Sequence, residues 1–247
     1  MNDAAVLDLP TRRDEDFRYS DLSALGTVWP VAREQITVPP GENGSLSLVP
    51  EGPGVAVRHL VITLGDGARF DLRALNAGHA FGRIAIDVRL GARAEFTFGA
   101  AQVGGSSETL EIVTTVTHAA TDAVSRQTIR SVLAGAATGT YLGRVAVARG
   151  ANGTDSNQSV RAMLLDRTAT ANARPELEIY ADDVKCAHGC AVGELDAAGL
   201  FYLQSRGLTP ADAKRLMLQA FIAEAFVGAA DQDALSAAAL TALEALL

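Results

Sequence analysis

The chain is 247 residues long and 48% hydrophobic, which is enough apolar surface to bury the core of one large domain or two small ones. Its net charge of −8, from 29 acidic and 21 basic residues, argues against a general nucleic-acid or anionic-membrane partner, since both would repel an acidic surface. Two cysteines cannot form the disulfide framework of a secreted fold, and the sequence shows neither a signal peptide nor a long apolar span, so we expect a cytoplasmic protein.

Residues 1–28 are predicted to form an N-terminal helical arm. In the segment LPTRRDEDFRYSDLSAL, aromatic residues and leucines recur at roughly helical spacing between charged residues. Chain termini stay ordered only when side chains dock them, so we expect Phe17 and Tyr19 to pin the arm to the body of the protein.

Residues 29–193 are predicted to form a mainly β core. Prolines and glycines punctuate its first part and leave room for short strands at 35–38 and 45–49. From Val55 onward, β-branched runs alternate apolar and polar residues, which is typical of strands. Glycine-containing turns recur at spacings of about twenty-five residues or more, which fits a parallel β-helix, or solenoid. A closed antiparallel barrel or a sandwich is the alternative, because such turns serve those folds equally well.

Residues 194–247 are predicted to form a C-terminal helical domain. Its first helix is expected at 194–206, with Gly207 at the position of a C-cap glycine. Thr209 and Pro210 then form a strong start signal, with Thr209 as the N-cap and Pro210 at the first helical position. A third, alanine-rich helix is expected at roughly 233–246.

The segment EIYADDVKCAHGCAVG, between the strands and the helices, concentrates the soft metal ligands of the chain. It holds both cysteines, Cys186 and Cys190, with His188 midway between them. Transition metals and iron–sulfur species prefer thiolate and imidazole, so these three residues are the candidate metal ligands. Cα atoms four residues apart on a strand are about 13 Å apart, so Cys186 and Cys190 cannot share one ion. Cys186 and His188 can, and Cys190 joins them only if Gly189 bends the chain.

A three-ligand set leaves a fourth coordination position to another chain, to solvent or to substrate, which favours an interfacial or transient site. A purely structural role stays open, with Cys186 as a small buried hydrophobe and His188 hydrogen-bonded at a turn. A nucleophilic Cys/His enzyme is a further alternative, although nothing in the sequence resembles a third orienting group.

The remaining polar candidates have simpler interpretations. The other histidines, His59, His79 and His118, have no cysteine or carboxylate at ligand spacing and are expected to be structural or surface residues. A polar turn is predicted at Asn152, Asp155, Asn157 and Gln158. No Gly-x-x-x-x-Gly-Lys-Ser/Thr loop occurs, so any ATP dependence has to come from a partner.

Two segments resemble a known family. RPELEIYADDVKCAHGCAVGELDAAGLFYLQSRGLTPADAKRLMLQAFIAEAF closely resembles the C-terminal core of the SufB/SufD family of iron–sulfur cluster assembly proteins, and RRDEDFRYSDLSAL resembles the arginine-rich N-terminal motif of its SufD branch. The resemblance implies a right-handed parallel β-helix capped by helical ends. It also implies a non-catalytic scaffold or accessory subunit of the SUF machinery.

The same resemblance implies partners and a site. A SufB-like subunit is expected to pair with the β-helix edge, and a SufC-like ATPase to dock on the C-terminal helices. A nascent iron–sulfur cluster would be held transiently at the SufB–SufD interface, with His188 and Cys186 contributed by this chain and no cofactor bound tightly to the chain alone.

This chain departs from the family pattern in two respects. It is short, which predicts fewer turns of the β-helix, and Cys190 stands where a small or hydroxylated residue is expected. Three rival functions stay open. A SufB-type scaffold would need a sulfur-accepting cysteine elsewhere in the body. A β-helical polysaccharide-acting enzyme is disfavoured by the 5% aromatic content and the missing signal peptide. The third is a structural homodimer that pairs through an exposed β-edge.

Overall fold

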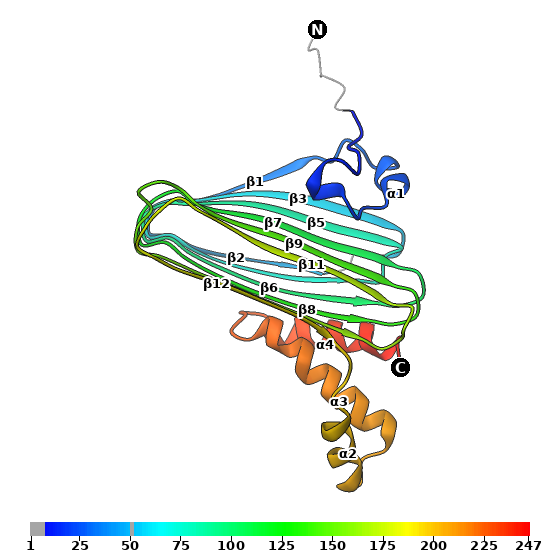
Figure 1. Cartoon of the computed structure of the whole chain (residues 1–247). Coiled ribbons are helices and arrows are strands. Elements are labelled where there is room, and N and C mark those ends of the chain that lie inside the picture. The colour runs from blue at the N-terminus through cyan, green and yellow to red at the C-terminus, as the bar shows by residue number, and fades with distance from the viewer. Residues whose placement is uncertain (1–7, 50–51) are drawn as a thin grey trace.

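The computed structural model describes residues 8–49 and 52–247, and its body is a flattened parallel β-solenoid (Figure 1). Every turn of the chain contributes one strand to each of two facing six-stranded sheets, in which all neighbouring strands pair in parallel. The odd sheet contains β1 (Arg33–Val38), β3 (Val55–Leu64), β5 (Phe81–Leu90), β7 (Thr109–His118), β9 (Thr138–Val147) and β11 (Thr170–Ile179). The even sheet contains β2 (Asn43–Leu48), β4 (Arg69–Ala77), β6 (Glu95–Gly104), β8 (Val124–Leu133), β10 (Thr154–Leu164) and β12 (Val184–Gly193).

The parallel pairing confirms the predicted β-helix and excludes the antiparallel barrel and sandwich. The strands predicted at 35–38 and 45–49 correspond to β1 and β2. The strand β11 begins at Thr170 and runs through Pro175. A proline is tolerated there because β11 is the last strand of its sheet and has a free side.

The repeat lengthens along the chain. Arg33 pairs with His59, a separation of 26 residues, whereas Thr138 pairs with Thr170, a separation of 32 residues. The strands stay in register because the additional residues are accommodated in the corners. Alternate side chains of both sheets fill the space between them and form the main core, which includes Leu60, Ile62 and Phe98.

The N-terminal arm packs on the outer face of the odd sheet. It consists of the short helical turn η1 (Glu15–Phe17) and the helix α1 (Leu22–Gly26), and residues 1–7 of the predicted arm lie outside the described residues. As predicted, Phe17 holds the arm in place: its ring lies 4.3 Å from the Arg83 guanidinium and meets Trp29 edge to face. Tyr19, in contrast, is 40% exposed.

A buried ion pair fixes the arm at the same place. Arg83 and Glu111, both almost fully buried, form a salt bridge on the outer face of the odd sheet. Ser20 Oγ donates a hydrogen bond to Glu111 Oε2 at 2.8 Å, and Arg83 Nη2 donates to the Asp16 carbonyl oxygen at 2.9 Å.

Four helical segments follow the solenoid: α2 (Ala197–Ser205), α3 (Pro210–Ala223), η2 (Glu224–Phe226) and α4 (Gln232–Glu244). As predicted, Thr209 caps α3 by accepting a hydrogen bond from the Asp212 amide, and Gly207 adopts the positive φ that ends α2. In residues 8–49 and 52–247, no helix has the combined length and apolar character needed to cross a membrane.

The helices α3 and α4 cover the outer face of the even sheet, and α2 projects away from it (Figure 1). Their apolar side chains form a second core with Leu75, Val103 and Val132 of the sheet. At the edge of this core, Arg130 pairs with Glu224 at 2.7 Å and Arg73 donates to the Ala225 carbonyl oxygen at 2.8 Å.

Candidate functional site

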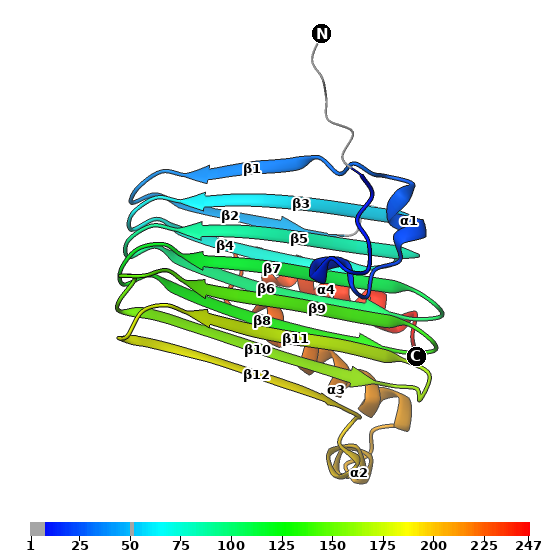
Figure 2. The same ribbon diagram turned by 45° about the horizontal axis from the view of Figure 1, so that its top comes forward.

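The strand β12 carries the predicted ligands and forms the last edge of the even sheet (Figure 2). It follows a bend at Asp182 and Asp183 and pairs with β10 along its whole length. Its other side pairs with no strand in the part of the chain that the structure describes. The edge therefore lies at the open end of the solenoid.

Register determines which way the three candidate ligands face. Cys186 lies opposite Ser156, His188 opposite Gln158 and Cys190 opposite Val160 of the preceding strand. These three residues of β10 are buried inside the solenoid. Because in-register neighbours of a parallel sheet share a face, Cys186, His188 and Cys190 all belong to the interior face. They are accessible because no further turn of the described chain covers them: Cys186 is half-buried, and His188 and Cys190 are exposed.

The strand remains continuous through the three ligands. Gly189 pairs with Ser159 in the regular ladder, so the bend that would bring Cys190 toward the other two residues is not formed. At the rise of a β-strand, Cys186 and His188 are about 7 Å apart at Cα, and Cys190 is about 13 Å from Cys186. Among the described residues, no three His, Cys, Asp or Glu side chains gather closely enough to hold a metal ion. The edge thus offers an incomplete ligand set.

Both thiols are protonated in the free protein at neutral pH. Burial raises the pKa of the Cys186 thiol, opposed in part by hydrogen bonding to the backbone of Ser156, and the nearby Asp155 carboxylate raises it further. Burial also raises the pKa of Cys190. The thiolate is the metal-binding form, so a metal or cluster that binds here has to displace a proton.

The structure places a polar network behind this edge that sequence reasoning missed. The predicted polar turn is wrong for most of its residues, since only Asn152 lies in the turn and Asp155, Asn157 and Gln158 belong to β10. Gln158 is 1% exposed and points into the solenoid. Burial alternates along this strand from Thr154 to Ala162, but the polar composition of its sequence, TDSNQSVRAML, resembles that of a turn.

A second set of buried polar side chains ends next to Cys186. His118 Nε2 lies 2.9 Å from Ser125 Oγ, which lies 2.9 Å from Ser156 Oγ. Ser156 is the register neighbour of Cys186. His118 is fully buried, and this burial lowers its pKa to about 4, so it is neutral at physiological pH. As predicted, His118 is a structural histidine.

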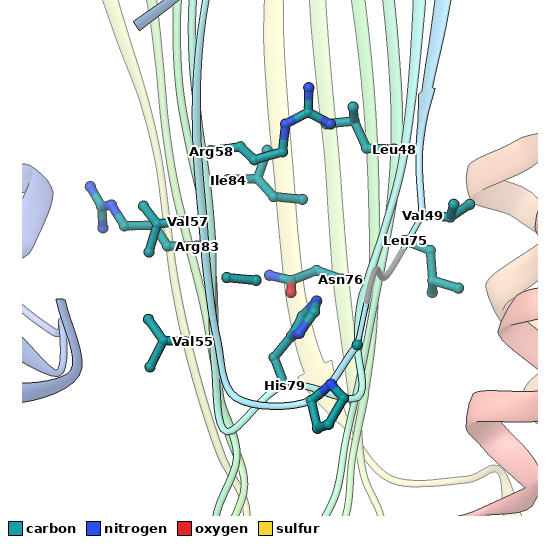
Figure 3. Close-up of a pocket in the computed structure, with 13 residues that line it drawn as sticks. Leu48, Val49, Val55, Val57, Arg58, Leu75, Asn76, His79, Arg83 and Ile84 are labelled. Carbon is teal, nitrogen blue, oxygen red and sulfur yellow. The ribbon is translucent and has the colours of Figure 1, made fainter. Parts of the chain in front are cut away.

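The other two histidines lie far from β12. His59 Nε2 is 2.8 Å from Asp87 Oδ2 on the outer face of the odd sheet, a carboxylate partner that the sequence spacing did not reveal. His79 is buried near the first end of the solenoid and borders a cavity of about 320 Å³. Figure 3 shows His79 and Asn76 pointing into the space between the sheets and Arg83 pointing outward. This cavity has no cysteine in its lining.

Comparisons with known proteins match most of this chain to one family. Residues 51–221 match the family model for SUF system FeS cluster assembly, SufBD core domain. The chain is similar to the iron–sulfur cluster assembly protein SufD of Escherichia coli, with 39% identity over 100 residues that cover 40% of this chain and 24% of the relative. It is also similar to SufD of Bacillus subtilis, with 30% identity over 121 residues that cover 49% of this chain and 28% of the relative. A SufBD family protein of Synechocystis is 43% identical over 84 residues, which are 34% of this chain and 18% of the relative. The aligned segments thus span about a quarter of the length of these relatives.

Proposed function

The chain belongs to the SufBD core family of SUF-system iron–sulfur cluster assembly proteins, and from this we propose that it is a SufD-like, non-catalytic scaffold subunit that acts in the cytoplasm. In this proposal, the open end of the solenoid pairs with a SufB-like subunit and the C-terminal helices receive a SufC-like ATPase. The nascent iron–sulfur cluster is cargo that is held transiently between the two scaffold subunits.

One observation carries the proposal: the Cys186 and His188 side chains lie on the edge strand β12, which pairs with β10 on one side and with no described strand on the other. Thiolate and imidazole suit an iron–sulfur species, and two donors leave coordination positions that must be filled from outside the chain. A partner that docks on this edge would supply them. The site is therefore well suited to a shared cluster and poorly suited to a private metal ion.

The open end also has the surface of a protein interface. The interior side chains of the last turn are uncovered, with Ile179 41% and Val192 47% exposed. The backbone groups on the free side of β11 and β12 can pair with further strands. The first end of the solenoid differs, because the inward-facing Glu34 of β1 forms an ion pair with Arg58 there. Inward-pointing charges discourage edge pairing, so the last end is the better docking surface.

The ATPase is assigned to α2 and to the exposed side of α3, because aromatic and apolar side chains are exposed there. Phe201 is 74% exposed and Tyr202 is 56% exposed on α2, and Leu216 of α3 is 46% exposed. Several exposed apolar and aromatic side chains that lie close together, as on α2 and α3, are typical of protein interfaces. Only Glu194–Asp196 separate β12 from α2, so a force applied to the helices would act directly on the strand that carries the ligands.

Co-expression with SufB-like and SufC-like partners tests the two surfaces separately. We expect the three chains to co-purify. Val192→Asp at the open end should release the SufB-like chain and keep the SufC-like chain, and Phe201→Asp on α2 should do the reverse. The exposed Val227, which lies between η2 and α4 and outside the two sets of residues named above, provides a matched control as Val227→Asp. Failure of the wild-type chain to co-purify with either partner would refute the proposal.

The site is tested by substitution of its ligands in the purified complex. We expect His188→Ala to reduce cluster formation from iron and sulfide while the thermal unfolding of the isolated chain stays unchanged, because His188 is exposed. Cys190→Ala should have a small effect, since its position on the strand separates it from the other two ligands. Unchanged cluster formation in His188→Ala would show that His188 has no role in the site.

The same edge can also accept a second copy of this chain when no partner is present. Light scattering of the isolated chain and of the chain mixed with a SufB-like subunit distinguishes the two assemblies. We expect the SufB-like subunit to replace the second copy, because the proposed cluster site needs ligands that a second copy does not add in the same arrangement. A homodimer that persists with excess SufB-like subunit would favour a purely structural role.

A further inference from the structure

The interior column that ends at His188 changes character along the solenoid. Register stacks Leu72, Phe98, Gln127, Gln158 and His188 on five successive strands of the even sheet. The first two side chains are apolar, and the two that precede His188 are amides that are each 1% exposed. Burying an amide is unfavourable unless hydrogen bonds compensate, so polar side chains at these core positions require an explanation.

Hydrogen bonds account for part of this polar cluster. Tyr141 Oη, from the odd sheet, donates to Gln127 Oε1 at 3.2 Å. Gln158 Nε2 donates to Tyr141 Oη at 3.3 Å, and Thr114 Oγ1 also donates to Gln127 Oε1 at 3.1 Å. The amide of Gln158 is therefore held by its nitrogen.

The oxygen of the same amide has no partner. Gln158 Oε1 is buried and accepts no hydrogen bond from any residue that the structure describes. Gln127 Nε2 is also without a partner, but it lies one turn further from the open end. On its outer side, the register neighbour of Gln158 is His188, and both residues line the same shallow depression at the edge.

We propose that Gln158 is a positioning residue for His188, with Oε1 accepting a hydrogen bond from one imidazole N–H. Adjacent strands lie about 4.8 Å apart, so the two side chains on the shared interior face are within reach of each other. The bond fixes the ring and its tautomer, and it leaves the second ring nitrogen directed at the open end as a ligand. This inference rests on the proposed function of His188 in cluster assembly.

The chemistry of imidazole makes such a partner useful. A neutral imidazole has one donor and one acceptor nitrogen, and the hydrogen bond made by the donor decides which nitrogen remains free for a metal. Metal-ligating histidines almost always donate their other N–H to an oxygen, and loss of that oxygen typically lowers metal affinity or activity about 10- to 100-fold. An exposed histidine on an edge strand otherwise has no such constraint.

The first test needs only the isolated chain. Histidine is labelled with ¹⁵N, and the tautomer of each ring is determined by NMR at mildly alkaline pH; His188→Gln assigns the signals among four histidines. We expect one dominant tautomer for His188, a mixture in Gln158→Met, and recovery in Gln158→Glu, which keeps an oxygen acceptor. Gln127→Met removes a buried amide from the same network and should leave His188 unchanged.

Several results would overturn the inference. One is a mixture of His188 tautomers in the wild-type chain, and another is an unchanged tautomer in Gln158→Met. An equal change in Gln127→Met would also overturn it, because it would show a general disturbance of the network.

The second test separates this inference from the proposed function. In the co-purified complex supplied with iron and sulfide, Gln158→Met should slow cluster formation about tenfold, and Gln158→Glu should restore it. If His188→Ala leaves cluster formation unchanged while the tautomer still depends on Gln158, the proposed role of His188 fails and the positioning contact stands. If His188→Ala impairs cluster formation and Gln158→Met leaves both tautomer and rate unchanged, the positioning role fails alone.

Discussion

Gly99 on β6 is expected to be indispensable for the attachment of the C-terminal helices. The chain passes so close to this position that an added Cβ would lie 1.8 Å from the Ala225 carbonyl oxygen and 2.4 Å from Arg73 Nη1. The Ala225 carbonyl oxygen is a backbone atom and cannot move aside by a change of side-chain rotamer. Gly99→Ala should therefore push η2 away from the even sheet by more than 1 Å, since nonbonded atoms need about 3.5 Å between their centres.

The cost follows from the contacts that this shift breaks. Overpacking of a well-packed site costs about 1–3 kcal/mol, and loss of the hydrogen bond from the Arg73 guanidinium to Ala225 costs about 1.5–3 kcal/mol. The two effects overlap, because both are relieved by the same movement. We expect Gly99→Ala to lower the free energy of unfolding by about 2–5 kcal/mol.

Urea unfolding and amide hydrogen exchange measure the two parts of this prediction. The unfolding midpoint should fall, and the exchange protection of α3 and α4 should decrease while that of β5 and β7 is retained. Gly193→Ala is the matched control, because a Cβ there meets nothing within 4 Å. Equal stability and equal helix protection in Gly99→Ala and Gly193→Ala would refute the reasoning.

Two further predictions concern stability. Arg83→Met leaves Glu111 buried without its cation and should lower the free energy of unfolding by about 3–5 kcal/mol in urea titrations. A loss below about 1 kcal/mol, as expected for the exposed Arg69–Glu95 pair, would contradict the assigned role of the buried pair. Burial lowers the folded-state pKa of His118 from 6.5 to about 4, so between these values the unfolded chain binds a proton that the folded chain does not. The contribution of neutral His118 to the free energy of unfolding is complete above about pH 6.5 and decreases by about 3 kcal/mol as the pH falls toward 4. His118→Gln should flatten this part of the pH–stability curve. An unchanged curve would refute the assignment.

The sequence predicted the elements better than their arrangement. Alternating β-branched runs and glycine turns indicated the strands, and the signals at Gly207 and Thr209 located two helix boundaries. The solenoid itself was ambiguous from periodicity, because the repeat lengthens from 26 to 32 residues and weakens any fixed period. Parallel and antiparallel sheets differ in the relative direction of neighbouring strands and in their hydrogen-bond pattern, whereas the alternation along a single strand can be the same in both.

The candidate site was likewise predictable only in part from the sequence. The period of two along a strand places Cys186, His188 and Cys190 on one face and separates the outer two, and the structure has this arrangement. The burial of Gln158 was not predictable, because its hydrogen-bond partner Tyr141 lies 17 residues earlier in the chain, on the facing sheet. A polar segment that is buried by distant residues resembles a surface turn when it is considered alone.

The unequal ends of the solenoid restrict the symmetry of its assemblies. The inward-facing Glu34–Arg58 ion pair discourages strand pairing at the first end, whereas the last end presents the exposed Val192. A contact between two last ends uses the same kind of surface on both subunits, so a two-fold axis closes it and no docking surface remains. A contact from first end to last end would leave one of each free and would propagate into a filament. The placement of a single ion pair therefore favours a finite pair over an open polymer.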